Sequence, residues 1–488
     1  MKKTSKKRTK LESDASNHLD KEDVEDNETM SETETENAYS SESESSEGQF
    51  TPELSETDSE IFKRQEIPIK VPIEEEKYYA VYYEDRCLHS TGKPKDDPTY
   101  PFSSCRFNGN LLEAQSAVRN LTKCNNNFST YKLQNKNGYI ILNNYVISSK
   151  RFACEESVTY ATHADYTFLD NLKPLLERWN GPISLAIHAP GADFNKTVDS
   201  IIYLRNCVDL VKELVTFHLY FLEQHSPYKI PEPDSILDLT YDCSSDPPFI
   251  GAKRENMYVT ENNLTYPINV GRNVARTMSE TYFMITSDIE LYPNPNIIPD
   301  FLKLIAGCEY KIIPYKPVVF VLHIFEIKKQ IPIPSTKSQL IKLLEKGAVI
   351  PFHKKICAVC HTIPKFEEWK KTNQSEGLQI FNIGSRTGAY YHWEPIYIGT
   401  NAEPKYDERL TWEGMKDKVV QGYELCLMNY SFLVLDNAFL IHKPGIKVSD
   451  PDKNKWRKRF IDINDNLIDN TILPEIKKRY KSTSQCQL

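Results

Sequence analysis

The chain has 488 residues, 40% of them hydrophobic, which is enough to bury a large core and to form more than one domain. Its net charge is −8, but the first sixty residues hold 7 basic and 18 acidic side chains, so the remainder carries about +3. This near-neutral body excludes a general nucleic-acid-binding surface, and no run reaches the ~18–20 apolar residues of a membrane helix.

The chain divides by composition into four parts. Residues 1–66 ("SETETENAYSSESESSEGQ") offer almost nothing to bury and are predicted to be a disordered acidic tail, with a solvating or a phospho-regulated role. Residues 67–154 are Tyr-rich and contain Cys and Pro, which indicates a stem or an irregular subdomain. Residues 155–460 are predicted to form an α/β domain, and residues 461–488 a C-terminal extension.

Strands and helices are expected to alternate from residue 157 onward. Alternation of this kind predicts an α/β fold with a mostly parallel central sheet flanked by helices, in which ligands bind at the carboxyl ends of strands. The expected strands are 157–162, 183–190, 215–222, 281–291, 318–325 and an apolar run that ends at His442; the expected helices are 164–179, 200–215 and 266–279.

An acid pair lies near the end of the strand expected over 281–291, in "YFMITSDIELYPNP". Asp288 and Glu290 flank Ile289 at a predicted strand end, where they can converge on one hard cation such as Mn²⁺ or Mg²⁺. Such a metal site serves a nucleotide-sugar donor, whose diphosphate leaves with a negative charge. The alternative is a turn-capping Asp beside a solvated Glu.

Two further motifs carry basic or metal-binding side chains. In "YPINVGRNVAR", Arg272 and Arg276 lie one helical turn apart, either as a surface pair or, with Asn273, at the donor. In "FLVLDNAFLIHKPGIK", His442 ends an apolar strand and is either a structural residue or a third metal ligand. Lys443 would then face the diphosphate.

The sequence "CAVCH" at residues 357–361 matches the c-type haem attachment pattern and half of a zinc site. There is no second CxxC motif in the sequence. A local disulfide, or simply two thiols, is therefore the favoured interpretation.

Five motifs in order, "YPINVGRNVAR", "SDIELYP", "HWEPIYIG", "YDERLTWEG" and "DNAFLIHKPG", resemble glycosyltransferase family 49 over residues 157–447. The resemblance implies a GT-A-like nucleotide-diphospho-sugar transferase domain at residues 155–460, dependent on Mn²⁺ or Mg²⁺ and using a UDP-sugar. Asp288 and Glu290 match its acid-x-acid metal motif, His442 its late metal ligand, and Arg272 and Asn273 its donor helix. Glu290 stands where many relatives have a second Asp.

The family's best-known reaction transfers glucuronic acid with inversion, which requires a general base beside the acceptor hydroxyl. We expect this base to be Asp407, then Glu394, with Glu408 a further candidate. Glu413 and Asp417 follow in the same region. Asp407 or Glu394 can instead be a helix-capping or ion-paired acid. "DERLTWEG" departs from the family's usual turn, which leaves the acceptor glycan or glycoprotein open.

The resemblance also implies a membrane-anchored protein of the Golgi lumen. No anchor is seen in this sequence, so either it is missing from this version or the acidic tail replaces it. Two alternatives to glucuronic acid transfer remain: transfer of a different UDP-sugar, and a catalytically degenerate relative that binds nucleotide or glycan. A third class, an interaction protein that acts through its acidic tail, stays open as well.

Overall fold

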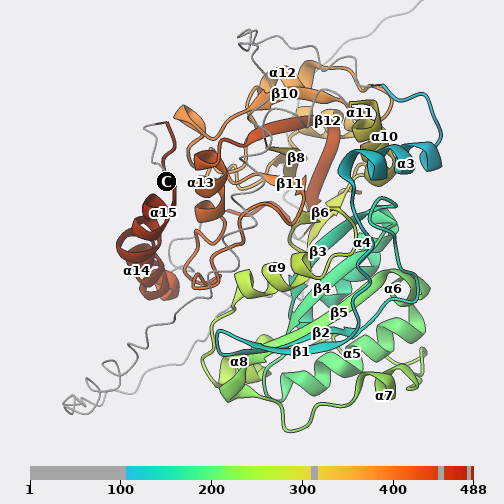
Figure 1. Ribbon diagram of the computed structural model, residues 1–488. Coiled ribbons are helices and arrows are strands. Elements are labelled where there is room, and N and C mark those ends of the chain that lie inside the picture. Colours follow the sequence, from blue (N-terminus) through green and yellow to red (C-terminus); the bar gives the residue numbers. More distant parts are fainter. Residues whose placement is uncertain (1–105, 309–316, 444, 449–454, 481–484) are drawn as a thin grey trace, which may run out of the picture. The chain divides into compact units, whose positions relative to one another are not determined.

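The computed structural model describes residues 106–308, 317–443, 445–448, 455–480 and 485–488 (Figure 1). The predicted disordered tail of residues 1–66 and the first part of the predicted 67–154 subdomain lie outside these residues. Of the helices described, none is both long and apolar enough to cross a membrane.

A twelve-stranded mixed sheet runs through the described chain in the order β1-β2-β5-β4-β3-β6-β11-β8-β12-β10, with β7 paired to β12 and β9 to β8. Strands β5, β4, β3 and β6 pair in parallel, as do β8 and β12, and antiparallel strands complete the sheet. The predicted α/β class is confirmed. The strands are β1 (Lys132–Lys136), β2 (Tyr139–Val146), β3 (Val158–Ala164), β4 (Ile183–His188), β5 (Val215–Leu222), β6 (Phe283–Thr286), β7 (Leu291–Pro293), β8 (Val318–Ile327), β9 (Val349–Pro351), β10 (Ile380–Gly384), β11 (Ile396–Gly399) and β12 (Ser431–His442).

Helices cover both faces of the parallel strands (Figure 1). Successive strand residues point to opposite faces, so Tyr160 belongs to the buried cluster that includes α4, α5 and α10, whereas Ala161 belongs to the cluster that includes α9. The helices are α3 (Leu111–Thr122), α4 (Leu172–Trp179), α5 (Asp193–Cys207), α6 (Asp209–Leu214), α7 (Pro233–Leu237), α8 (Tyr258–Glu261), α9 (Ile268–Thr277), α10 (Ile297–Gly307), α11 (Lys337–Glu345), α12 (Phe366–Lys371), α13 (Val419–Leu427), α14 (Lys458–Leu467) and α15 (Leu473–Arg479).

Three predicted elements differ in detail. The helix expected over 164–179 starts as a 3-10 helix (Tyr166–Asn171), and the helix expected over 200–215 is interrupted at Val208, whose backbone is extended. The strand expected over 281–291 ends at Thr286, because the chain turns before β7. In that turn the Leu291 N–H donates to the Asp288 carbonyl (3.1 Å).

Helix α9 approaches the sheet closely at Gly271. A Cβ atom at this position would lie 2.6 Å from the Tyr220 hydroxyl and 2.9 Å from His163 Cβ. Both distances are shorter than a carbon contact allows, so only glycine permits this separation between helix and sheet. The residue that follows, Arg272, is thereby brought close to the end of β3.

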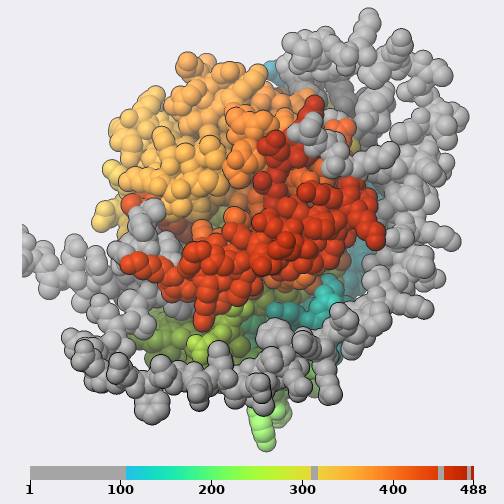
Figure 2. Space-filling view, turned by 90° about the vertical axis from the view of Figure 1, so that its left-hand side faces the viewer, coloured from blue at the N-terminus to red at the C-terminus, as the bar shows by residue number. Residues whose placement is uncertain are grey.

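The C-terminal residues pack onto α13 rather than forming a separate body. Ile468, Ile472 and Ile476 share a buried cluster with Val420 and Tyr423 of α13. The disulfide Cys426–Cys486 joins the same two segments. In Figure 2 these residues form a red band across the face of the molecule. The predicted boundary at residue 460 falls inside α14, and strands β1 and β2 of the predicted 67–154 subdomain belong to the sheet.

Candidate active site

The turn that carries Asp288 and Glu290 lies between β6 and β7, at the carboxyl end of β6. The buried Tyr160 hydroxyl lies 3.0 Å from the Asp288 carbonyl oxygen and 2.8 Å from that of Leu291. Strand β7 pairs antiparallel with the end of β12, where Leu291 is opposite His442. Sheet pairing therefore brings two distant motifs, "SDIE" and "LIHK", to one place.

The Asp288 carboxylate is surrounded by groups that stabilise its charge. Arg272 donates to Oδ1 (3.1 Å), His163 Nε2 lies 3.3 Å from the same oxygen, and Lys418 Nζ lies 3.7 Å from Oδ2. Burial opposes ionisation, but these groups outweigh it and hold the Asp288 pKa well below its ordinary value. Asp288 is thus a fixed anion, 28% of its side chain remaining exposed.

Arg272 is enclosed and joins two carboxylates. Its side chain is 1% exposed, and it forms ion pairs with both Asp288 and Asp417. Although burial disfavours the charge, the two acids raise the Arg272 pKa above its ordinary value. Arg276 is buried as well. The alternative that Arg272 and Arg276 are an ordinary surface pair is therefore wrong.

Glu290 and His442 form the second part of the acid site. His442 Nε2 lies 3.8 Å from a Glu290 carboxylate oxygen, and the imidazole is almost fully buried. Among the described residues, none forms a hydrogen bond to His442 Nδ1. Lys443, the next residue, is exposed, so its predicted contact with the diphosphate stays a prediction.

The donor set fits a divalent cation. Two carboxylates and an imidazole suit Mn²⁺ or Mg²⁺, and acids outnumber cations around them. The acids include Asp170, Asp288, Glu290, Glu394 and Asp417, and the cations include Arg272 and Lys418.

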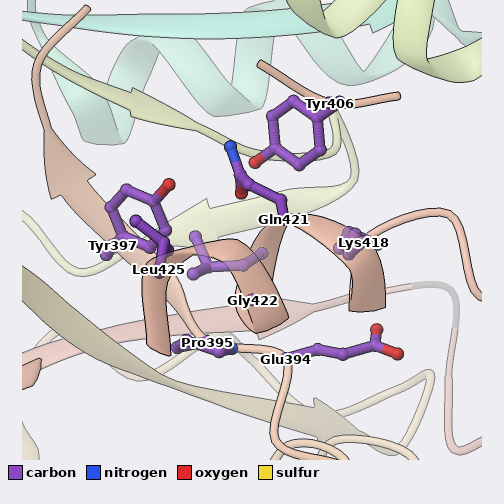
Figure 3. Close-up of a pocket in the computed structure, with 9 residues that line it drawn as sticks. Glu394, Pro395, Tyr397, Tyr406, Lys418, Gln421, Gly422 and Leu425 are labelled. Atoms are coloured by element: carbon purple, nitrogen blue, oxygen red, sulfur yellow. The ribbon is translucent and has the colours of Figure 1, made fainter. Parts of the chain in front are cut away.

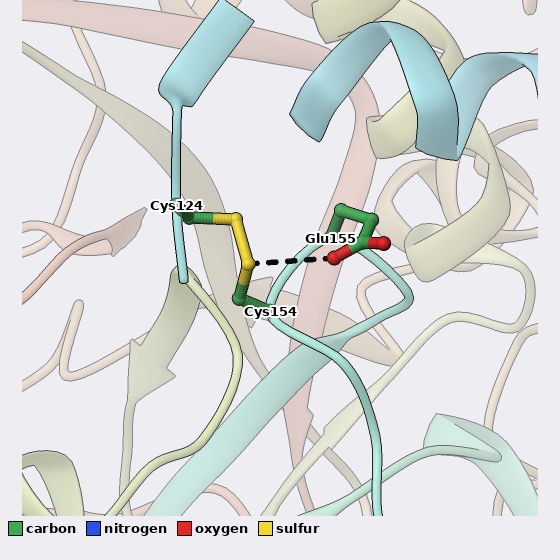
Figure 4. A group of neighbouring side chains, drawn as sticks. All are labelled: Cys124, Cys154 and Glu155. Atoms are coloured by element: carbon green, nitrogen blue, oxygen red, sulfur yellow. Dashed lines mark hydrogen bonds between the residues drawn. A yellow bond between two sulfur atoms is a disulfide. The ribbon is translucent and has the colours of Figure 1, made fainter. Parts of the chain in front are cut away.

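Asp288, Glu290 and His442 are not drawn together as tightly as a filled metal site. Within the described chain, the one group of three candidate ligand atoms all within 4.8 Å of one another is Cys124, Cys154 and Glu155 (Figure 4). Its two cysteines are joined in a disulfide, so they are not available as thiolate ligands. The metal role of the acid pair and His442 stays a prediction.

Three other predicted site residues stabilise the segment from residue 400 to 408. Asn273 donates to the Tyr406 carbonyl (2.8 Å) and to Glu408 (3.0 Å). Arg276 donates to three carbonyl groups in the segment. Glu408 also accepts from Lys136 (3.0 Å), in the hairpin of β1 and β2. In these contacts the three side chains bind other groups of the protein. The donor-binding role of Asn273 and Arg276 and the catalytic role of Glu408 stay predictions.

Glu394 lines a small pocket at the first turns of α13, together with Tyr406, Lys418 and Gln421 (Figure 3). Its side chain extends along the side of α13 on which Lys418 lies. Burial raises the Glu394 pKa to about 7, with Asp417 adding to the rise and Lys418 opposing it. A carboxylate with a pKa near neutrality is suited to accept a proton.

Asp407, the base expected first, is instead held by a neighbouring cation. Arg409 donates to both of its oxygens (2.9 and 2.6 Å), and the same guanidinium donates to Glu475 (2.8 Å) of α15. This arrangement matches the alternative of an ion-paired acid. Of the two predicted bases, Asp407 alone has both oxygens bound by a described cation, and the catalytic role of each stays a prediction.

Two residues of this site were missed from the sequence. His163 is at the carboxyl end of β3, and the rule that ligands bind at such ends applies to it directly. Lys418 follows Asp417 and precedes α13, and no pattern within the sequence indicates that it faces Asp288.

Known proteins are similar to this chain over most of the α/β domain. A family model described as "Glycosyl-transferase for dystroglycan" matches residues 157–481. Beta-1,4-glucuronyltransferase 1 of Danio rerio is 33% identical over 296 residues, which is 59% of this chain and 66% of that protein. The Mus musculus protein of the same name is 25% identical over 335 residues (67% and 76%). Xylosyl- and glucuronyltransferase LARGE1 of Homo sapiens is 25% identical over 195 residues (40% and 24%).

Proposed function

Because the chain belongs to the glycosyltransferase family that its motifs resemble, family 49, we propose that it transfers glucuronic acid from a UDP donor to a glycan acceptor with inversion. One observation carries this proposal. The acid pair, at the end of a parallel strand, lies beside His442 and within a cluster of two cations and two further acids. Strand ends of this kind are where α/β folds bind nucleotides.

Asp288, Glu290 and His442 would hold Mn²⁺ or Mg²⁺, which when bound supplies positive charge for the departing diphosphate. The protein's own cations serve a different purpose. Arg272 and Lys418 keep Asp288 ionised and fixed in orientation, so that its free lone pairs are presented without any reorganisation.

Glu394 acts as the general base in this proposal. Inversion requires the acceptor hydroxyl to attack the sugar from the face opposite the leaving UDP, while a base removes its proton. Glu394 has the raised pKa and the pocket position for this role, and Lys418 lies nearby to stabilise the carboxylate form. Asp407 serves to attach α15 to the 400–408 segment.

UDP release from UDP-glucuronic acid with Mn²⁺ and a panel of aryl glycosides tests the proposal. We expect turnover by the wild type and a loss of about 10²–10³-fold in Asp288→Ala, as is typical when one preorganised electrostatic contact is removed. Asp246→Ala, at an exposed acid, is the matched control. Equal turnover by wild type and Asp288→Ala contradicts the proposal, and Mn²⁺-dependent UDP binding without turnover by the wild type favours a degenerate relative.

The Golgi lumen is the proposed location. Four disulfides occur within the described residues, Cys124–Cys154, Cys207–Cys243, Cys357–Cys360 and Cys426–Cys486, and such pairs persist in oxidising compartments. Immunofluorescence of the tagged full chain beside Golgi and endoplasmic reticulum markers tests this, and a cytosolic signal contradicts it.

A further inference from the structure

The loop between β9 and α12 is closed by the disulfide Cys357–Cys360, which is one of the two alternatives that the sequence left open. Main-chain hydrogen bonds reinforce the closure. The Cys357 N–H donates to the His353 carbonyl (2.7 Å), and the Cys360 N–H donates to the Cys357 carbonyl (3.2 Å). We refer to residues 353–361 as the disulfide loop.

The disulfide loop contacts both main-chain polar groups of Glu394. The Glu394 N–H donates to the Cys360 carbonyl (2.8 Å), and His361 Nδ1 lies 3.2 Å from the Glu394 carbonyl oxygen. Burial lowers the His361 pKa to about 4, so this ring is neutral near pH 7 and can donate from Nδ1. The backbone position of Glu394 therefore depends on two consecutive residues of one loop.

The residue after Glu394 limits its backbone further. Pro395 restricts Glu394 to extended conformations, so with both polar groups fixed the side-chain torsions are the main freedom that remains (Figure 3). The disulfide loop thus determines where the carboxylate can reach.

Little apolar packing holds the outer part of the disulfide loop. Ile356 is 41% exposed and Val359 is 49% exposed. A loop with few buried contacts opens easily unless a covalent link limits its conformations. The Cys357–Cys360 bond is such a link.

We propose that the disulfide loop is a positioning device for Glu394, which holds its carboxylate at the distance that proton removal from the acceptor requires. This inference rests on the proposed role of Glu394 as the base. Misplacement of a reacting group by about 1 Å can cost on the order of a hundredfold in rate. Loss of the disulfide or of the His361 hydrogen bond should therefore lower kcat while leaving donor binding intact.

The test compares Cys357→Ser/Cys360→Ser, His361→Leu and His361→Asn with the wild type. Cys207→Ser/Cys243→Ser removes the disulfide between α5 and the segment after α7 and is the matched control. We expect kcat for UDP release to fall on the order of ten- to a hundredfold in the first two variants. UDP affinity with Mn²⁺, measured by calorimetry, should change less than about twofold. His361→Asn, whose amide can replace the Nδ1 donor, should restore most of the rate.

Hydrogen exchange of the peptide that contains Glu394 gives a readout independent of turnover. Faster exchange of the Glu394 amide in Cys357→Ser/Cys360→Ser, but not in the control, is expected. Unchanged kcat and unchanged exchange in an active enzyme overturn the inference, as does an equal loss of UDP binding, which would indicate a general structural role. If Glu394→Gln retains full turnover while the amide exchanges faster, the assigned base is wrong although the loop contact is real. A wild type without any turnover overturns both the proposed function and the positioning role of the disulfide loop.

Discussion

Two acids of one short region, Glu394 and Asp407, have opposite environments. Glu394 lies in a pocket where burial raises its pKa to about 7, and no described cation is paired with it as closely as Arg409 is with Asp407. Asp407 is held through both oxygens by Arg409, whose side chain is 41% exposed and also reaches Glu475. The surroundings of Glu394 leave its carboxylate suited to accept a proton, whereas both oxygens of Asp407 are already bound by Arg409 near the surface.

The difference shows that a carboxylate's position in a motif says little about its role. The "YDER" motif supplies its own Arg two residues after the Asp, whereas "WEP" supplies no cation and is followed by Pro395. Burial has the largest influence on the charge of Glu394, and Lys418 and Asp417, from another segment, modify it. Four changes test this comparison.

Glu394→Gln should have the largest effect. The amide keeps the size of the side chain but has no proton-accepting carboxylate, so kcat should fall about 10²–10⁴-fold. Asp407→Asn, its matched partner, should stay within about threefold of the wild type. Initial rates of UDP release measure both, and a larger loss in Asp407→Asn than in Glu394→Gln would reverse the assignment.

Arg272→Met should destabilise the fold by about 3–5 kcal/mol, since it removes a buried cation and leaves the partly buried Asp288 and Asp417 without the partner they share. Urea denaturation followed by circular dichroism measures the change in the free energy of unfolding. Arg409→Met is the control at the more exposed ion pair. Similar losses in both variants would show that the contacts of Arg272 contribute no more to stability than the more exposed contacts of Arg409.

The rate should depend on pH with a midpoint near 7. Because the Glu394 pKa is raised, the carboxylate is largely protonated at pH 6 and ionised at pH 8, so kcat should rise with pH through about 7. A fall of about tenfold from pH 8 to pH 6 corresponds to one ionisation. A flat profile in the wild type, or an unchanged profile in Glu394→Gln, would contradict the assigned base.

Arg409→Ala should have the smallest effect, about 0.2–1 kcal/mol in the free energy of unfolding, because the pair with Asp407 and Glu475 is partly exposed to solvent. Thermal unfolding at low and high salt measures this, and the difference from wild type should shrink with salt. A loss above about 2 kcal/mol would place Asp407 among the essential internal contacts.

Much of the fold followed from patterns in the sequence. Apolar, β-rich runs predicted β3, β4 and β5 closely, and these strands are buried along nearly their whole length. The helix expected over 266–279 is α9. The acid pair and His442 were expected to meet, and β7 does pair with the end of β12. The turn after Thr286 was missed, since the apolar run continues through Ile289 and Leu291 while the backbone bends.

The electrostatic partners of the site were harder to predict. Arg272 was expected to face the donor, yet it is enclosed between Asp288 and Asp417, which are 16 and 145 residues away in the sequence. Local spacing gives no information about contacts between residues so far apart. The Arg409 pair with Asp407, by contrast, spans two residues, and an ion-paired Asp407 was among the alternatives left open.

The close approach at Gly271 links packing to charge. If a methyl group there forces α9 away from Tyr220 and His163, the guanidinium one residue later retreats by a similar amount, and Asp288 loses a neutralising neighbour. The packing of α9 on the sheet and the pKa of Asp288 would then change together in one variant. Efforts to change the preference for the donor sugar should therefore keep α9 in place and vary other residues.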